Sequence, residues 1–190
     1  MIHIPKLIIG FIGKAGAGKT TVANYLIQKY NFKIFSFAEP LKQMIVTAGM
    51  CKREELYGVN KTENARWLMQ KLGTEIFRNQ VDPDYWVKRG GAIISLLLKL
   101  GDVVIDDVRF PNEAQYISDK GGLLVRVIHE GHKGLEGEYG EHASEQLQDT
   151  IVPDYVISAP SGDLQTLYYA LENILNMEYV MQVGKHGYNA

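Results

Sequence analysis

The stretch of sequence that decides the fold lies near the N-terminus and reads Gly13-Lys14-Ala15-Gly16-Ala17-Gly18-Lys19-Thr20. It fills every position of the phosphate-binding pattern G-x-x-x-x-G-K-[S/T]. An apolar run precedes it, and a helix is predicted to follow from Thr21 onward. A strand, a glycine-rich turn and a helix N-terminus form an anion site, because glycines let the backbone wrap closely and the helix dipole favours negative charge. The complete pattern in this context predicts that residues 13–21 bind ATP, and argues against a glycine-rich turn that binds nothing.

Composition indicates an ordinary soluble enzyme. The 190 residues are 46% hydrophobic and 22% charged, which suits one domain with a substantial core. A formal net charge of -2 argues against a protein that coats nucleic acid. The single cysteine forms no internal disulfide, the apolar run at 93–98 is too short to span a bilayer, and the N-terminus does not resemble a signal peptide. We therefore expect a cytoplasmic protein, in the host cytoplasm if a phage encodes it, with no nucleic-acid or membrane partner.

Predicted strands alternate with predicted helices, which is typical of a doubly wound α/β fold with a parallel sheet of about five strands. The strands are expected at residues 6–12, 33–37, 102–106, 123–128 and 155–158. The helices are expected at residues 19–30, 40–48, 62–79, 85–100, 112–120 and 162–176. The tail from Tyr179 onward has little pattern and is expected to fray or to pack on a partner subunit.

The chain is predicted to form a single domain, residues 1–190. Two of its segments are additional to a minimal α/β core. Residues 39–100 form a long helical insertion, and residues 129–145 form a polar, glycine-rich and histidine-rich loop. On a phosphate-binding core such segments typically hold a second substrate and act as a lid.

The insertion contains a readable helical pattern. Ala65, Leu68, Leu72 and Ile76 recur at helical spacing and predict a core face. Arg66 and Gln70 lie one turn apart on another face, where they either grip a phosphate and a base edge or form an ordinary solvated surface. Tyr85 and Trp86 are core residues or stack on a base.

The predicted third strand runs into two acids, Asp106 and Asp107, followed by Arg109. Acids at the carboxyl edge of a parallel strand beside a phosphate-binding loop are typical magnesium-linked groups. The candidate metal ligands are therefore Thr20, Asp106 and Asp107, with Lys19 on the β- and γ-phosphates. Asp106 and Asp107 point to opposite faces and should have different roles, and Arg109 is placed to hold a phosphate. The alternative is a simple turn cluster before the next helix.

Five further blocks of sequence carry a family resemblance. They are residues 37–42 (FAEPLK), 66–75 (RWLMQKLGTE), 84–88 (DYWVK), 107–114 (DVRFPNEA) and 142–145 (HASE). Together with the phosphate-binding loop, and in this order, they resemble the phage-type deoxynucleoside monophosphate kinases, a group of P-loop nucleotide kinases. The match covers most of residues 6–177.

The resemblance implies transfer of the γ-phosphoryl of Mg-ATP to a (deoxy)nucleoside 5′-monophosphate, with Mg²⁺ as the cofactor. It implies an acceptor phosphate held by Lys42, Arg66 and Arg109, with Asp107 near metal and acceptor. It further implies a homodimer. The implied substrate pocket is formed by Phe37, Ala38, Gln70, Gly73, Thr74 and Trp86, and is closed by His142 and Glu145. The sequence leaves open which bases are accepted and whether the acceptor carries ribose or deoxyribose.

The lid departs from the family pattern, because relatives often place an arginine just after the fourth strand. Here the only lysine in the segment just after that strand, residues 129–133, is Lys133, so we expect either Lys133 or Lys14 to supply the missing charge. The histidines at 129, 132 and 142 superficially suggest zinc but lack the spacing of a zinc site.

Two other functions compete with nucleotide phosphorylation. One is a kinase for a non-nucleotide phosphate acceptor, of the phosphomevalonate or dephospho-coenzyme A type. The other is an ATPase that uses nucleotide as a switch.

Overall fold

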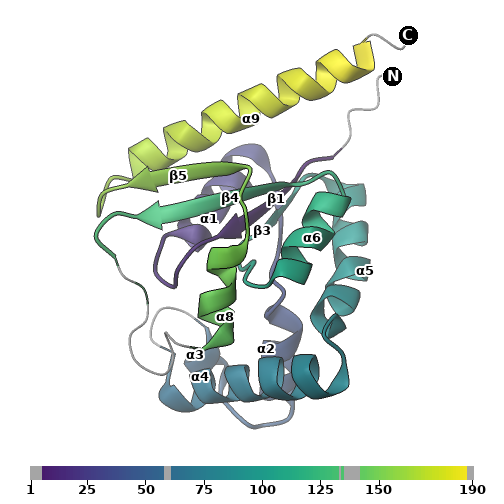
Figure 1. The fold of residues 1–190 in the computed structure, drawn as a ribbon, viewed down its shortest axis with the longest axis vertical. Helices are drawn as coiled ribbons and strands as arrows, with labels where there is room; N and C mark the ends of the chain where they lie inside the picture. Colours follow the sequence, from purple (N-terminus) through teal and green to yellow (C-terminus); the bar gives the residue numbers. More distant parts are fainter. Residues whose placement is uncertain (1–5, 58–60, 133, 135–141, 188–190) are drawn as a thin grey trace.

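The computed structural model describes residues 6–57, 61–132, 134 and 142–187, with side chains as far as residue 181. Five parallel strands form one sheet in the order β2-β3-β1-β4-β5 (Figure 1). Their bounds are Ile8–Ile12 (β1), Lys33–Phe35 (β2), Val103–Ile105 (β3), Leu123–His129 (β4) and Tyr155–Ala159 (β5). The predicted doubly wound parallel sheet is confirmed, and each predicted strand is present to within two residues at either end.

One face of the sheet is covered by α1 (Lys19–Tyr30) and α9 (Leu164–Gly187). Alternate strand residues such as Ile9, Phe11 and Val104 face this layer and are fully buried. The alternation follows from the two-residue period of a strand, and both faces are apolar because both are covered.

The other face is covered by α5 (Tyr85–Leu100) and α6 (Pro111–Asp119), as Figure 1 shows. Ile8, Ile12 and Ile105 point to this side and pack with Ile94 and Ile117. The sheet thus has a helical layer on each side, and the loops at its carboxyl edge are free to form a site.

The insertion between β2 and β3 contains α2 (Glu39–Thr47), α3 (Arg53–Leu56), α4 (Glu63–Gln70), the π-helix η1 (Lys71–Val81) and α5. It has its own apolar core, in which Leu41, Ile45, Leu56, Ala65 and Leu68 are buried. Within the insertion, α2, α3 and α4 lie at the end of the molecule opposite α9, whereas α5 runs back beside the sheet (Figure 1). The short helix α3 was not predicted.

The predicted core face of the insertion helix is confirmed as far as Leu72, which packs partly buried on this core, and is wrong at Ile76. Ala65 and Leu68 are buried as expected, whereas Ile76 is 40% exposed. The π-helix changes the angle between successive residues, so the face that continues the core is formed instead by Gly73, Thr74 and Arg78.

The last helix was predicted to end at residue 176, with a tail that frays or packs on a partner subunit, yet α9 continues to Gly187. Tyr179 explains part of the difference, because its ring packs on the core and its hydroxyl donates to Asp102 Oδ2 at 2.6 Å. The described part of the chain contains no helix that is long and apolar enough to cross a membrane. The expected homodimer stays a prediction.

Packing between α5 and the sheet depends on Gly90. A methyl group added there would lie 2.8 Å from Phe35 Cζ and 3.1 Å from Phe37 Cε1. We expect Gly90→Ala to lower the free energy of unfolding by about 1–3 kcal/mol, because the overpacking outweighs the gain in helix propensity. Urea denaturation measures this change.

The matched control is Gly91→Ala in the same helix, where the added methyl group meets the Tyr116 hydroxyl at 3.2 Å. That variant should be neutral, or more stable by up to about 1 kcal/mol. Equal destabilisation of both variants would contradict the role given to Gly90.

Candidate functional site

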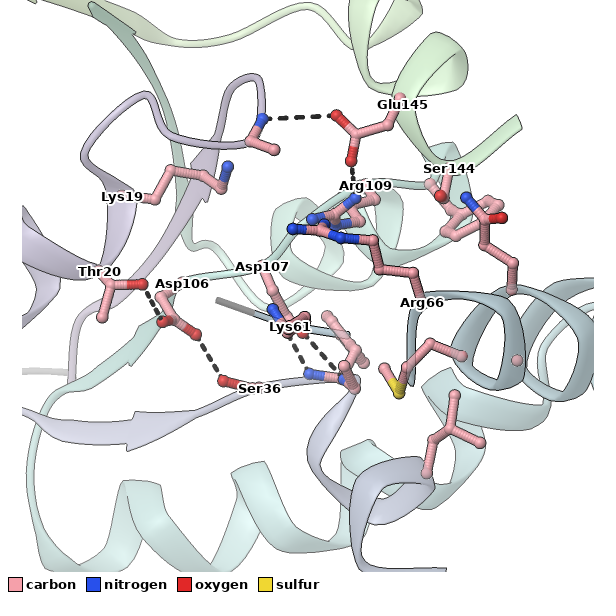
Figure 2. Close-up of a pocket in the computed structure, with 18 of the residues that line it drawn as sticks. Lys19, Thr20, Ser36, Lys61, Arg66, Asp106, Asp107, Arg109, Ser144 and Glu145 are labelled. Atoms are coloured by element: carbon pink, nitrogen blue, oxygen red, sulfur yellow. Dashed lines mark hydrogen bonds and ion pairs between the residues drawn. The ribbon is translucent and has the colours of Figure 1, made fainter. Parts of the chain in front are cut away.

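One cavity of about 610 Å³ runs from the glycine-rich loop to the helical insertion (Figure 2). Its walls come from the β1–α1 loop, the segment after β2, the segment after β3, and α4 with η1. These segments lie far apart in the sequence. Those that follow strands meet at the cavity because the carboxyl ends of parallel strands lie at one edge of the sheet. Most of the predicted site residues line this cavity.

The glycine-rich loop has the backbone expected of a phosphate cradle. Gly13, Gly16 and Gly18 all have positive φ angles, of 149°, 81° and 96°, and α1 begins at Lys19. Such angles suit glycine and let the loop curl around an anion. Thr20 and Thr21 follow in the first turn of α1 and line the cavity.

Lys19 is buried inside this loop. Its Nζ donates to the carbonyl oxygen of Lys14 at 2.9 Å and to that of Gly13. Burial, with the nearby Arg109 guanidinium, lowers the pKa of Lys19 to about 8. The ammonium has no carboxylate partner within ion-pair distance among the described side chains, so an incoming anion would stabilise its charged form.

The two neighbouring acids have different partners, as predicted. Asp106 accepts hydrogen bonds from the Thr20 hydroxyl at 3.0 Å and from the Ser36 hydroxyl (Figure 2). Thr20 and Asp106 thus meet at one point of the cavity wall, with oxygen atoms of the kind that Mg²⁺ binds. Ser36 was missed by sequence reasoning; its only signal was its place at the end of a predicted strand.

Asp107, the third predicted metal ligand, does not contact this pair in the structure. Its two oxygens accept the backbone N–H groups of Phe37 and Ala38 at 2.8 and 2.9 Å. Burial and the neighbouring Asp106 raise the pKa of Asp107. The carboxylate fixes the turn before α2, and so sets the position of Lys42 on that helix.

Cations gather in the half of the cavity formed by the insertion. Lys42, Arg66 and Arg109 line it as predicted, and a fourth cation, Lys61, joins them (Figure 2). Lys61 belongs to no recognised motif, and nothing in the sequence around it signalled a place in the site.

Glu145 links the two halves of the cavity. This residue is only 3% exposed; one carboxylate oxygen pairs with Arg109, and the other accepts the Ala15 backbone N–H at 3.4 Å (Figure 2). Gln148 also donates to Glu145, at 3.1 Å. The short helix α8 (Ala143–Gln146) therefore ties the phosphate-binding loop to the arginine after β3.

The predicted lid residues have mixed outcomes. Lys14 does not line the cavity; its Nζ pairs with Asp149 at 2.5 Å, in the 3-10 helix η2 (Leu147–Thr150). His142 also lies outside the lining, because its Nδ1 accepts the Ser144 N–H at the start of α8, at 3.2 Å. His132 instead approaches the loop and donates from Nε2 to the Ala15 carbonyl oxygen at 2.7 Å. Lys133 lies outside the described residues.

The residues predicted to form the base pocket lie together in one wall of the cavity. Gln70, Gly73 and Thr74 line it from α4 and η1. Trp86 also lines it but is 4% exposed, and its indole Nε1 donates to the Gly73 carbonyl oxygen at 2.8 Å. The indole supports the π-helix from behind, so it shapes the pocket rather than offering a free face for stacking.

A buried ion pair supports this wall and was not foreseen. Arg78 on η1 pairs with Glu113 at the start of α6, and both side chains are less than 8% exposed. Glu113 also accepts the backbone N–H of Arg109 at 2.8 Å. Among the described residues, no three histidine, cysteine or acidic side chains are grouped closely enough to hold a metal ion.

Similarity to known proteins agrees with this geometry. The model of the family "Deoxynucleotide monophosphate kinase" matches residues 51–171. A protein of Acanthamoeba polyphaga mimivirus assigned as a deoxynucleotide monophosphate kinase is 32% identical over 151 residues, which cover 66% of this chain and 75% of that protein. The deoxynucleotide monophosphate kinase of Escherichia phage RB69 is 29% identical over 127 residues, which cover 65% of this chain and 49% of that protein.

The fold itself is shared more widely. A solved dephospho-CoA kinase from Campylobacter jejuni superposes with a TM-score of 0.51 at 12% sequence identity, and covers 90% of this chain and 96% of its own. That likeness concerns the fold alone. The family match spans more than half of the chain, including the insertion from residue 51 onward and the segment after β3, and the mimivirus relative is matched over three quarters of its length. The chain therefore belongs to the deoxynucleotide monophosphate kinase family.

Proposed function

We propose that this chain transfers the γ-phosphoryl of ATP to the 5′-phosphate of a deoxynucleoside monophosphate, which yields the diphosphate and ADP. The observation that carries the proposal is the single cavity with a phosphate-binding loop at one end and a cluster of cations on the insertion at the other. Family membership supplies the class of acceptor.

The donor end is suited to the triphosphate. Backbone N–H groups of the glycine-rich loop and the start of α1 offer donors to the β- and γ-phosphates. Lys19 lies within the loop and would exchange its carbonyl partners for phosphate oxygens, which offset its burial far better.

The oxygens of Thr20 and Asp106 fit a magnesium ion, since they are hard ligands already brought together at the loop. Bound there with ATP, the ion would neutralise charge on the phosphates. Ser36 holds the other Asp106 oxygen and keeps the carboxylate turned toward Thr20.

The acceptor end is suited to a phosphate monoester. Lys42, Arg66 and Arg109 approach from three different elements, so they can surround a dianion. The attacking atom is an oxygen of that dianion and carries no proton, so no general base is needed. The reaction then depends on aligning two phosphates and excluding water, which is what the insertion and α8 do.

Arg109 lies where the two substrates meet. In the structure its guanidinium pairs with Glu145, which also accepts the Ala15 N–H of the glycine-rich loop. We assign Arg109 to the phosphoryl in transfer and Glu145 to holding that arginine. Lys14 and Lys133 are the remaining candidates for added positive charge, and Lys14 would first have to leave Asp149.

A coupled assay for ADP release tests this function with Mg-ATP, a panel of deoxy- and ribonucleoside monophosphates, and a reaction without acceptor. We expect one or more deoxynucleoside monophosphates to stimulate ADP release well above the reaction without acceptor. A rate indifferent to every nucleotide acceptor would overturn the proposal. Stimulation by a non-nucleotide phosphate would then identify a different kinase, and slow hydrolysis alone would indicate a nucleotide switch.

A further inference from the structure

Lys61 is a half-buried lysine at the edge of the insertion, where it lines the acceptor half of the cavity. We propose that Lys61 binds the 5′-phosphate of the acceptor nucleotide, together with Lys42, Arg66 and Arg109. This inference rests on the proposed function and adds to it a residue that no motif singles out.

The backbone holds Lys61 in place from its C-terminal side. The next residue, Thr62, is the N-cap of α4, and its hydroxyl accepts the Ala65 N–H at 3.2 Å. The Thr62 N–H is itself bonded to the Glu55 carbonyl oxygen on α3, at 3.4 Å. Lys61 therefore sits directly before the positive end of a helix, in a setting that favours an anion.

The Lys61 ammonium makes no hydrogen bond or ion pair with any residue that the structure describes, although it is half-buried. Two other lysines of the insertion do have carboxylate partners: Lys71 pairs with Glu75, and Lys88 pairs with Asp82. A buried charge without a partner is costly, so it is retained where a ligand supplies the partner.

The charged groups around Lys61 are mostly of its own sign. Lys42 from α2, Arg66 from α4 and Arg109 from the segment after β3 all repel it, and Asp107 is the one carboxylate that attracts it. Burial, followed by the repulsion of these three cations, lowers the pKa of Lys61 to about 8. Because both Asp107 oxygens are already bonded to backbone N–H groups, the cluster keeps an excess of positive charge.

The position of this excess charge identifies the acceptor phosphate as the ligand. At the donor end, the charges of Asp106 and Glu145 raise the pKa of Lys19. The charges of Lys42 and Arg66 on the insertion instead lower the pKa of Lys61. Arg109 and Asp107 influence both lysines and mark the boundary between the two halves. A phosphate monoester carries nearly two negative charges at neutral pH. Four cations exceed the charge of the two carboxylates beside them, Asp107 and Glu145, by that same amount.

The test compares Lys61→Met and Lys61→Arg with Lys88→Met, a change at an exposed lysine whose side chain is 67% exposed. For Lys61→Met we expect the KM of every accepted deoxynucleoside monophosphate to rise by about 10- to 100-fold, the loss typical of a charge-assisted hydrogen bond. The Kd of an ATP analogue should stay within twofold. Lys61→Arg should recover most of the loss, and Lys88→Met should leave all constants unchanged.

A pH profile separates charge from mere packing. The acceptor phosphate is already a dianion at pH 7.5, so an acceptor KM that rises above pH 8 reports loss of the lysine proton. We expect this rise in the unmodified protein and not in Lys61→Arg, whose guanidinium stays protonated.

Three results would overturn the inference: an unchanged acceptor KM in Lys61→Met, a change in ATP affinity instead, or an effect confined to one base. If Lys61→Met unfolds, which circular dichroism detects, the comparison is made with Lys61→Gln. Failure of the proposed function is recognised separately, because the unmodified protein would then show no stimulation by any deoxynucleoside monophosphate.

Discussion

Replacing Lys19 by alanine will lower kcat for phosphoryl transfer by about 10³-fold, a loss at the upper end for removal of one preorganised charge. Lys19 is 8% exposed and is held inside the glycine-rich loop by two carbonyl oxygens. Because it is positioned before substrate binds, it stabilises the charge that develops during transfer without reorganisation. Single-turnover measurements at saturating Mg-ATP and acceptor give the change in the chemical step.

The matched control is Lys29→Ala, which removes a lysine from the last turn of the same helix. Lys29 pairs with Glu172 on α9, far from the cavity lining, so kcat should stay within twofold. A Lys19→Ala enzyme that retains most of its kcat would remove this lysine from the mechanism. Circular dichroism of both variants shows whether either substitution has unfolded the protein.

Lys19 also illustrates why the fold was accessible from sequence. The glycine-rich pattern requires a strand before it and a helix after it, and β1 and α1 are found on either side. The central strand β3, Val103–Ile105, is a short apolar run buried on both faces, which is the expected signature of a parallel sheet. The local sequence was sufficient to predict a helix or a strand wherever its apolar residues kept one regular spacing.

Sequence reasoning was wrong where the period changed. A helix of constant pitch placed Ile76 in the core, but the π-helix over Lys71–Val81 puts Arg78 there instead. Such a helix is stabilised by tertiary contacts, here the Trp86 indole on the Gly73 carbonyl oxygen. No local sequence pattern predicts a contact between two residues that lie 13 positions apart.

In the candidate site, too, residues within sequence motifs could be predicted, and residues placed only by the tertiary structure could not. Residues carried by motifs, such as Thr20, Asp106 and Arg109, meet in the cavity. Ser36 and Lys61 were missed because each depends only on where the chain places it. His142 was predicted to contact substrate, but it accepts a backbone N–H at the start of α8 and lies outside the cavity lining.

The Arg78–Glu113 ion pair is the second place where a large effect is expected. We predict that Arg78→Met lowers the free energy of unfolding at pH 8 by about 3–5 kcal/mol, the usual cost of leaving a buried charge without its partner. Besides Glu113, the guanidinium donates to the carbonyl oxygen of Pro83 and the side chain of Asn112, both at 3.3 Å, and lies 3.8 Å from the Phe110 ring centroid. Urea denaturation measures the change.

The pH dependence of this loss tests its electrostatic origin. Burial raises the pKa of Glu113 to about 7 although Arg78 opposes the shift, and the ordinary value is 4.5. A carboxyl whose folded-state pKa is raised contributes stability at low pH and loses it as pH rises through 7. Removing Arg78 raises this pKa further, so the cost of Arg78→Met should be smaller at pH 6, where Glu113 is largely neutral in both proteins, than at pH 9.

A second substitution distinguishes an unpaired charge from a lost packing contact. In the double variant Arg78→Met/Glu113→Gln, the amide oxygen can still accept the backbone N–H groups of Arg109 and Phe110, while no charge is left buried. The double variant should therefore be more stable than Arg78→Met at pH 9 and nearly independent of pH. A loss that is equal at both pH values, or a double variant no better than the single one, would mean that Arg78 acts by filling space. Glu113 also fixes the backbone of Arg109. The acceptor KM should therefore rise in Arg78→Met and recover partly in the double variant. Such a result would show that the stability of this wall and the binding of the acceptor depend on the same ion pair.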